Sequence, residues 1–186
     1  MRTQRWRGVG CAALVVVFCF LAWLGVRPGI SQAMPPQGDL QEDGLVQVVL
    51  QEGVGGYTGT ADTYLNAWAQ NSNYGHTSYL AVRTQNAMST LLRFDLSDAL
   101  PPNAQVERAR LELWVLSQSN ASGLTASLYR VLRPWSEGQA TWNLAQAGEP
   151  WEVPGCDGST DRAQSPADSG VWDAASVWVG FEVCLL

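Results

Sequence analysis

The feature that most constrains the fold of this chain is a strict alternation of apolar and polar residues on both sides of a proline pair. Residues 92–96 and 109–115 each place an apolar side chain at every second position, with Pro101 and Pro102 between them. A period of two puts the apolar side chains on one face of a β-strand and the polar ones on the other. Proline has no backbone N–H to donate to a central ladder, so the pair marks a corner. Residues 89–116 therefore predict two half-buried strands in a hairpin around a proline corner.

Further segments of the chain repeat this pattern. Strands are expected at residues 61–65, 79–84, 126–133 and 177–185, with a possible first strand at 45–50. We expect the strand at 126–133 to pair with the one at 108–116 as an antiparallel hairpin, and the final strand to be apolar enough for burial. The chain as a whole holds nine tryptophans and 18 glycines. The prediction is an all-β fold, an antiparallel β-sandwich of jelly-roll type.

The N-terminal segment has the three parts of a secretory signal peptide. Three arginines precede an uncharged run from Val9 to Val26, and Ser31 and Ala33 frame a small-residue site. We expect residues 1–33 to be a signal peptide that is cleaved after Ala33. The alternative is an uncleaved signal anchor, since about 18 apolar residues are close to the minimum for crossing a bilayer. In both cases the rest is predicted to be secreted or extracellular, at the cell surface if attached, and in contact with a membrane only if the segment stays.

The remaining chain divides into a linker and one domain. Residues 34–56 are expected to hold the linker and the possible first strand, because 34–44 is rich in proline, glycine and acidic residues. Residues 57–186 form the predicted β-sandwich module, which has the size of a single domain. Cys156 and Cys184 fall in this module, and the sequence leaves open whether they pair.

The charge of the chain narrows the class of partner. It holds 11 basic residues, all arginine, and 17 acidic ones. Four arginines and no acidic residue precede Ala33, which leaves seven arginines against 17 acidic residues, a net charge of −10. Nucleic acids and anionic membranes require a basic surface, so neither is a predicted partner. Neutral glycans suit this surface, and anionic polymers suit it only through localised arginines or a bridging cation.

Three separated motifs in the centre of the chain carry a family resemblance. They are RFDLS at 93–97, ARLEL at 109–113 and WSEGQATWN at 135–143, preceded by DTYL at 62–65. This succession resembles the DNRLRE-domain family of secreted bacterial and archaeal β-sandwich modules. That family is related to the disaggregatase repeats and to an alginate-binding family of carbohydrate-binding modules.

The resemblance implies a noncatalytic module that binds polysaccharide or decorates a cell surface. The alternative function is a structural or adhesive repeat module of a surface protein, without a ligand site. Alginate-binding members hold their acidic polymer with basic side chains, whereas this domain is acidic and lacks lysine. Members also continue beyond the position that Leu186 reaches here, so we expect the chain to be truncated at its C-terminus.

The outward side chains of the alternating strands are the candidate ligand set. Arginines bind carboxylates or hydroxyls, and aromatic rings stack on sugars. Ordinary solvated side chains on different sheets are the alternative interpretation. The predicted carbohydrate-binding residues are Arg83, Arg93, Arg110, Trp114 and Tyr129.

Asp62 is the candidate metal ligand, and the metal would be a structural calcium ion. Calcium takes several oxygen ligands, of which Asp62 and the loop residues Asn71 and Asn73 could supply some. Turn geometry and capping are the alternative roles for these residue types. Calcium is therefore the one cofactor that the sequence suggests, with Asp62 as its best single ligand.

The sequence lacks a set of residues suited to catalysis. Glu137 lies among tryptophans, but a glycosidase needs two carboxyl groups about 5 to 10 Å apart across a cleft. No second carboxylate has a comparable aromatic setting. His76 is the only histidine in the chain, which leaves it without a partner for base catalysis. We expect no enzymatic activity, and we interpret Glu137 and the neighbouring tryptophans as structural.

Overall fold

The computed structural model describes residues 4–9, 15–17, 47–85, 87–100, 104–119 and 123–183, the first two ranges by their backbone alone. Within these ranges the chain forms β-strands, turns and loops, and no helix. The strands are β1 (Gln4–Val9), β2 (Val15–Val17), β3 (Thr60–Asn66), β4 (Leu80–Val82), β5 (Met88–Phe94), β6 (Ala109–Gln118), β7 (Leu124–Arg130), β8 (Leu144–Gln146), β9 (Glu149–Pro150), β10 (Asp168–Trp172) and β11 (Val177–Val183). The predicted all-β fold is confirmed.

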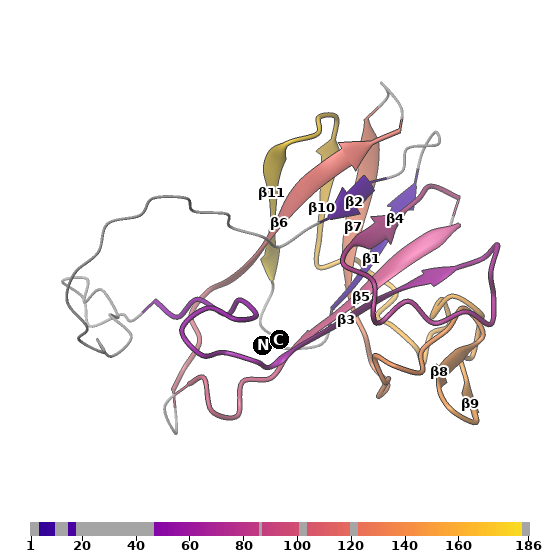
Figure 1. Ribbon diagram of the computed structural model, residues 1–186, viewed down its shortest axis with the longest axis horizontal. Coiled ribbons are helices and arrows are strands. Elements are labelled where there is room, and N and C mark those ends of the chain that lie inside the picture. Colours follow the sequence, from indigo (N-terminus) through magenta and orange to yellow (C-terminus); the bar gives the residue numbers. More distant parts are fainter. Residues whose placement is uncertain are drawn as a thin grey trace.

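Two antiparallel sheets form the body of the molecule (Figure 1). One sheet has the order β10-β7-β1-β5-β3 and the other has the order β11-β6-β2-β4. The short strands β8 and β9 form a separate ribbon beside them. The two sheets face each other across the main core, so the chain is a β-sandwich.

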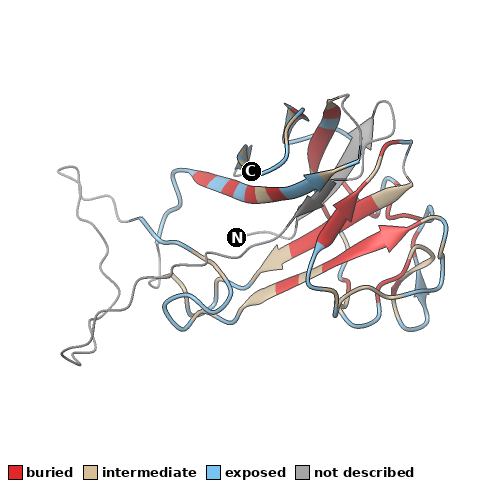
Figure 2. Ribbon diagram, turned by 45° about the horizontal axis from the view of Figure 1, so that its top comes forward, coloured by how far each residue is buried: buried red, intermediate tan, exposed pale blue. Residues whose placement is uncertain are grey.

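The main core takes residues from both sheets. Leu92 of β5 and Leu128 of β7 meet Val115 of β6 and Phe181 of β11 in one buried cluster. Along β6, from Ala109 to Val115, buried residues alternate with exposed or half-buried ones, and this banding is visible in Figure 2. The half-buried strand predicted at 109–115 is therefore confirmed.

A second core covers the outer face of the five-stranded sheet. Leu65 of β3 and Leu91 of β5 pack there against Trp135, Trp151 and Cys156. Strand β5 is consequently buried on both faces, with Leu91 on one side and Leu92 on the other. The prediction of a half-buried strand is wrong for β5, because the segment that follows β7 folds back over it.

Both predicted hairpins are wrong, since their strands lie in opposite sheets. Strand β5 pairs with β3 and β1, whereas β6 pairs with β11 and β2. Strand β7, expected beside β6, pairs with β1 and β10. Alternation identifies the buried face of a strand, but it does not identify the partner strand. The proline corner at 101–103 lies outside the described residues.

The N-terminal part of the chain departs from expectation in part. Residues 47–50, which belong to the possible first strand, are irregular, and the linker at 34–44 lies outside the described residues. Residues of the expected signal peptide form β1 and β2 within the sheets, and cleavage stays a prediction. None of the described residues belongs to a helix that is long and apolar enough to cross a membrane.

Candidate functional site

An aromatic pair stands on the outer face of the four-stranded sheet. Trp114 of β6 lies directly opposite Trp178 of β11, and side chains of such a cross-strand pair project from the same face. The ring centroids are 5.4 Å apart with an interplanar angle of 64°. Trp178 is 48% exposed. Large apolar side chains are usually withdrawn from water, so a pair in which Trp178 is exposed and Trp114 is half-buried marks a candidate binding surface on this open sheet.

Charged residues continue this face along both strands. The next outward pair is Glu112 with Gly180, and the one beyond is Arg110 with Glu182. A Cβ at position 180 would collide with the Arg110 guanidinium, so this side chain lies across the glycine. Arg110 Nε is 3.4 Å from Glu112 Oε1, and both side chains are more than half exposed. We call Arg110, Glu112, Trp114, Trp178 and Glu182 the outer face.

Sequence reasoning missed the β11 half of the outer face. The final strand is apolar enough to be predicted as buried, yet Trp178 and Glu182 are exposed while Phe181 and Val183 are buried. The signal was present in the sequence, because VWVGFEV alternates in the same way as the strand at 109–115. With β6 as its neighbour, β11 adds a second aromatic ring to the predicted Arg110 and Trp114.

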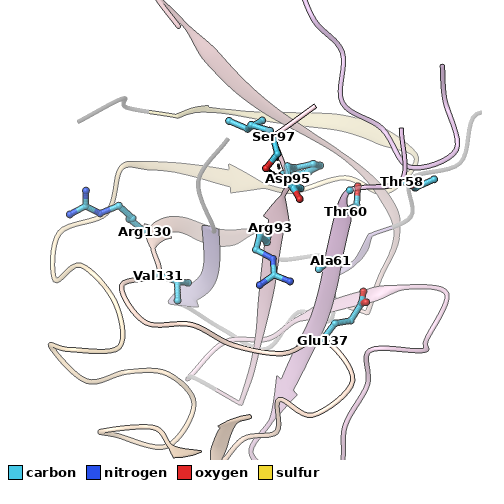
Figure 3. Close-up of a pocket in the computed structure, with 12 residues that line it drawn as sticks. Thr58, Thr60, Ala61, Arg93, Asp95, Ser97, Arg130, Val131 and Glu137 are labelled. Atoms are coloured by element: carbon cyan, nitrogen blue, oxygen red, sulfur yellow. Dashed lines mark hydrogen bonds between the residues drawn. The ribbon is translucent and has the colours of Figure 1, made fainter. Parts of the chain in front are cut away.

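Arg93 lies at a different place, on the outer face of the five-stranded sheet. It contributes to a hollow of about 970 Å³ at the ends of β5 and β7, shown in Figure 3. Arg93 Nη1 donates to the Trp135 backbone oxygen at 3.2 Å, and the guanidinium lies 5.2 Å from the Trp135 ring centroid. These contacts attach β5 to the segment that contains Trp135. Glu137 and Val131 also line the hollow.

Tyr129 and Arg83 likewise lie outside the outer face. The Arg162 guanidinium covers the Tyr129 ring at 3.9 Å, and Arg162 Nη2 is held by Asp157 Oδ1 at 2.7 Å. Arg83 follows β4, where its guanidinium lies 4.4 Å from the ring centroid of Trp68. Of the five predicted carbohydrate-binding residues, the structure therefore brings together Arg110 and Trp114.

Asp62 lies in β3 next to other carboxylates. Its backbone N–H donates to Glu137 Oε1 at 2.8 Å, in agreement with the structural interpretation of Glu137. Burial raises the pKa of Asp62 to about 6, and the negative charges of Glu137 and Glu52 contribute to the rise. The fold thus favours the protonated form of Asp62.

Replacing Asp62 with asparagine should stabilise the protein at neutral pH. A carboxyl group whose pKa is higher in the folded state contributes stability below its unfolded pKa, and this contribution is lost as pH rises through about 6. The thermal midpoint of the wild type should therefore fall between pH 4.5 and pH 7.5 by more than that of Asp62→Asn. Both are measured with chelator present. Asp98→Asn, at an exposed position, is the control, and a wild-type slope equal to that of Asp62→Asn would contradict the assignment.

The loop asparagines considered for calcium hold their loop to the segment at 137–143. Asn73 Nδ2 donates to the backbone oxygens of Glu137 at 2.7 Å and Ala140 at 2.8 Å. Asn143 Nδ2 donates to Asn71 Oδ1 at 2.9 Å. Both loop asparagines thus have structural partners. In the described part of the chain, no group of three or more His, Cys, Asp or Glu side chains could hold a metal ion.

Asp161 organises the long loop between β9 and β10. Its side chain is fully buried and accepts backbone N–H bonds from Glu152 at 2.9 Å, Val153 at 3.0 Å and Gly158 at 3.0 Å. Arg133 Nη1 is 3.3 Å from Asp161 Oδ1. Burial alone would raise the pKa of Asp161, but the three backbone donors and Arg133 hold it below its usual range. The loop is thereby fixed over the second core.

Comparison with known proteins assigns this sandwich to a family. A model of carbohydrate-binding module family 96 matches residues 56–172, more than half of the chain. The chain belongs to carbohydrate-binding module family 96. The searches of curated proteins and of solved structures gave no match. In this family 96 module the matched range includes Arg110 and Trp114 and ends with β10, so Trp178 lies just beyond it.

Proposed function

We propose that this family 96 module is a noncatalytic extracellular domain that binds a soluble, neutral polysaccharide across its outer face. The observation that carries the proposal is the solvent-facing pair Trp114 and Trp178 on adjacent strands of a carbohydrate-binding module. The resemblance of the central motifs to the DNRLRE-domain family supports the same function.

The outer face offers the two kinds of contact that a sugar chain uses. The apolar C–H face of a pyranose packs against an indole ring. Hydroxyl groups donate to the Glu112 and Glu182 carboxylates and accept from the Arg110 guanidinium. Trp114 and Arg110 are four residues apart on one strand, which separates them by about 13 Å along the sheet. Several consecutive sugar units would therefore contact the face.

The geometry of the aromatic pair favours a single soluble chain as ligand. The two indole planes meet at 64°, so they do not form one flat platform for a crystalline polymer surface. Two carboxylates beside one arginine, on a domain with a large acidic excess, favour an uncharged glycan over a polyanion.

The outer face binds without catalysis in this proposal. Glu112 and Glu182 are diagonal neighbours across β6 and β11, a spacing of about 7 to 8 Å. Glycosidases, however, hold the scissile bond between their carboxyl groups in a cleft. The Glu112 side chain is 58% exposed on an open sheet, where nothing positions an acid and a base on opposite sides of a sugar.

If the N-terminal segment directs export, the module is extracellular and has access to polysaccharides there. The alternative is a structural or adhesive repeat of a surface protein, and binding to a glycan separates the two. Calcium at Asp62 forms a further part of the proposal, since a cation would relieve the repulsion among Asp62, Glu137 and Glu52.

Affinity electrophoresis of the protein in gels containing neutral or uronate-rich polysaccharides tests this function. We expect retardation by at least one neutral polymer, and no release of reducing ends after long incubation with it. Each gel is run with calcium and with chelator, so a calcium requirement appears as a difference between them. Retardation by none of the polymers, under either condition, would refute the proposal.

A further inference from the structure

Gly180 interrupts the row of outward side chains along β11. It lies on the outer face between Trp178 and Glu182, directly opposite Glu112 of β6. Glycine weakens the interior of a strand, because it loses more backbone entropy on folding than other residues and packs no side chain. A glycine at such a position commonly marks a bulge, a bend or the close approach of another group.

A close approach is the explanation that the structure supports for this glycine. Gly180 is not one of the described glycines with a positive φ, so its backbone conformation is open to other residues. Strand β11 pairs with β6 residue by residue from Val177 to Val183, which excludes a bulge. A Cβ at position 180, however, would lie 2.6 Å from Arg110 Nε and 2.9 Å from Arg110 Cζ. The missing side chain therefore makes room for the Arg110 guanidinium.

This room brings the positive charge of Arg110 closer to the aromatic pair. Arg110 itself stands opposite Glu182, two outward rows from the pair of Trp114 and Trp178. Its guanidinium lies over the row between them, where Glu112 Oε1 is 3.4 Å from Arg110 Nε. One outward row corresponds to two residues of a strand, or about 7 Å. The guanidinium and the indole rings are thus close enough to contact the same sugar unit or two consecutive units.

Arg110 and Glu112 offer hydrogen-bond donors and acceptors side by side. A guanidinium has five N–H donors, and an ionised carboxylate only accepts. Both side chains are more than half exposed, so a ligand can reach their remaining donors and lone pairs. Two hydroxyls on adjacent carbons of a pyranose suit this arrangement, since one accepts from Arg110 while the other donates to Glu112. An isolated hydroxyl has to share one oxygen between the two partners.

We propose that Gly180 positions Arg110 so that Arg110 and Glu112 bind two adjacent hydroxyls of a glycan, which makes a 1,4-linked polysaccharide the ligand. This inference rests on the proposed binding function of the outer face. A sugar unit that is linked through C1 and C4 keeps its 2- and 3-hydroxyls free as an adjacent pair. A unit that is linked through C1 and C3 has no adjacent pair of free ring hydroxyls within the chain. The ligand class is therefore a neutral 1,4-linked polysaccharide with unsubstituted 2- and 3-hydroxyls.

Calorimetric titration of the protein with short oligosaccharides tests the ligand class. The probes are hexamers of glucose, mannose and xylose, each in the 1,4-linked and the 1,3-linked form. We expect at least one 1,4-linked hexamer to bind, and to bind about tenfold or more tightly than its 1,3-linked counterpart. Equal or tighter binding of the 1,3-linked form, or binding of no 1,4-linked hexamer, would overturn the inference. Binding of 1,3-linked chains would still uphold the outer face as a glycan site, whereas retardation by no polysaccharide in gels would refute the binding function itself.

Replacing Gly180 with alanine tests the positioning of Arg110. The added Cβ displaces the guanidinium, so the tightest 1,4-linked hexamer should bind about threefold to tenfold more weakly. The thermal midpoint should stay close to the wild type, because the far end of an exposed side chain can move aside. Arg110→Ala should weaken binding by about tenfold, and adding Gly180→Ala to it should cause no further loss, since the two changes remove the same contact.

Gly170→Ala is the matched control for this substitution. Gly170 lies in β10, where a Cβ would be 3.8 Å from its nearest contact, Trp172 Nε1. This variant should bind the hexamer like the wild type. An unchanged affinity of Gly180→Ala, or an equal loss on adding Gly180→Ala to the wild type and to Arg110→Ala, would show that the glycine does not act through Arg110 and would overturn the inference.

Discussion

Replacing Asp161 with alanine is expected to lower the free energy of unfolding by about 3 kcal/mol. The variant leaves three backbone N–H groups, of which that of Gly158 is buried, without their acceptor and Arg133 without its buried partner. A buried donor or a buried charge that loses its partner costs about 1 kcal/mol or more, whereas water replaces part of the loss at the part-buried donors. For a domain of this size the thermal midpoint should fall by about 10 °C. Asp173→Ala, at an exposed position, is the control and should stay close to the wild type.

The pH dependence of stability provides a second readout of Asp161. Its pKa is lower in the folded state, so its contribution is complete above the unfolded value of about 3.9 and is lost as pH falls through the folded pKa. The difference in midpoint between wild type and Asp161→Ala should therefore be largest at neutral pH and shrink below pH 4. A difference that is the same at pH 7 and pH 3 would contradict the buried-carboxylate account.

Alanine at either Trp114 or Trp178 is expected to weaken glycan binding by about tenfold or more. A central aromatic side chain in a binding surface commonly contributes about 2 kcal/mol, which corresponds to a factor of about 30. Truncating one ring also removes the edge contact of the pair, so the double variant should weaken binding by less than the product of the two single effects.

Trp68→Ala is the matched control for these substitutions. Trp68 is 65% exposed, contacts Arg83 and is not part of the outer face. Its removal should leave glycan affinity unchanged, and thermal midpoints should show that all variants are folded. Loss of binding in Trp68→Ala with normal binding in Trp178→Ala would show that the glycan binds near Trp68 and Arg83 instead of at the outer face.

The alternation in the sequence predicted the buried faces of the strands, but not their partners. Residues 109–115 lie in a strand that is buried on one face as expected, because hydrophobic burial acts on each strand separately. Pairing depends on connections that cross between the sheets, and nothing in the sequence of β7 distinguishes a neighbour of β6 from a neighbour of β10. The double burial of β5 depends on Trp135 and Trp151, which are distant in the chain.

The candidate site could be predicted only in part, because alternation identifies the face on which a side chain lies but not what covers that face. Arg110 and Trp114 share a face because they lie on one strand four residues apart. Arg93 and Tyr129 were also assigned to outward faces, but Trp135 and Arg162 cover them. Whether an outward side chain is free or covered depends on tertiary contacts, which strand periodicity does not contain.

The most direct test of the central claim is a glycan titration that is followed by the indole N–H resonances of the ¹⁵N-labelled protein. The resonances are assigned by single Trp→Phe variants, and the ligand is a soluble oligosaccharide of a polymer that retards the protein in gels. We expect the signals of Trp114 and Trp178 to shift with one common affinity, while those of the buried Trp135 and Trp151 stay in place. Shifts confined to Trp68, or to the tryptophans of the second core, would contradict binding at the outer face.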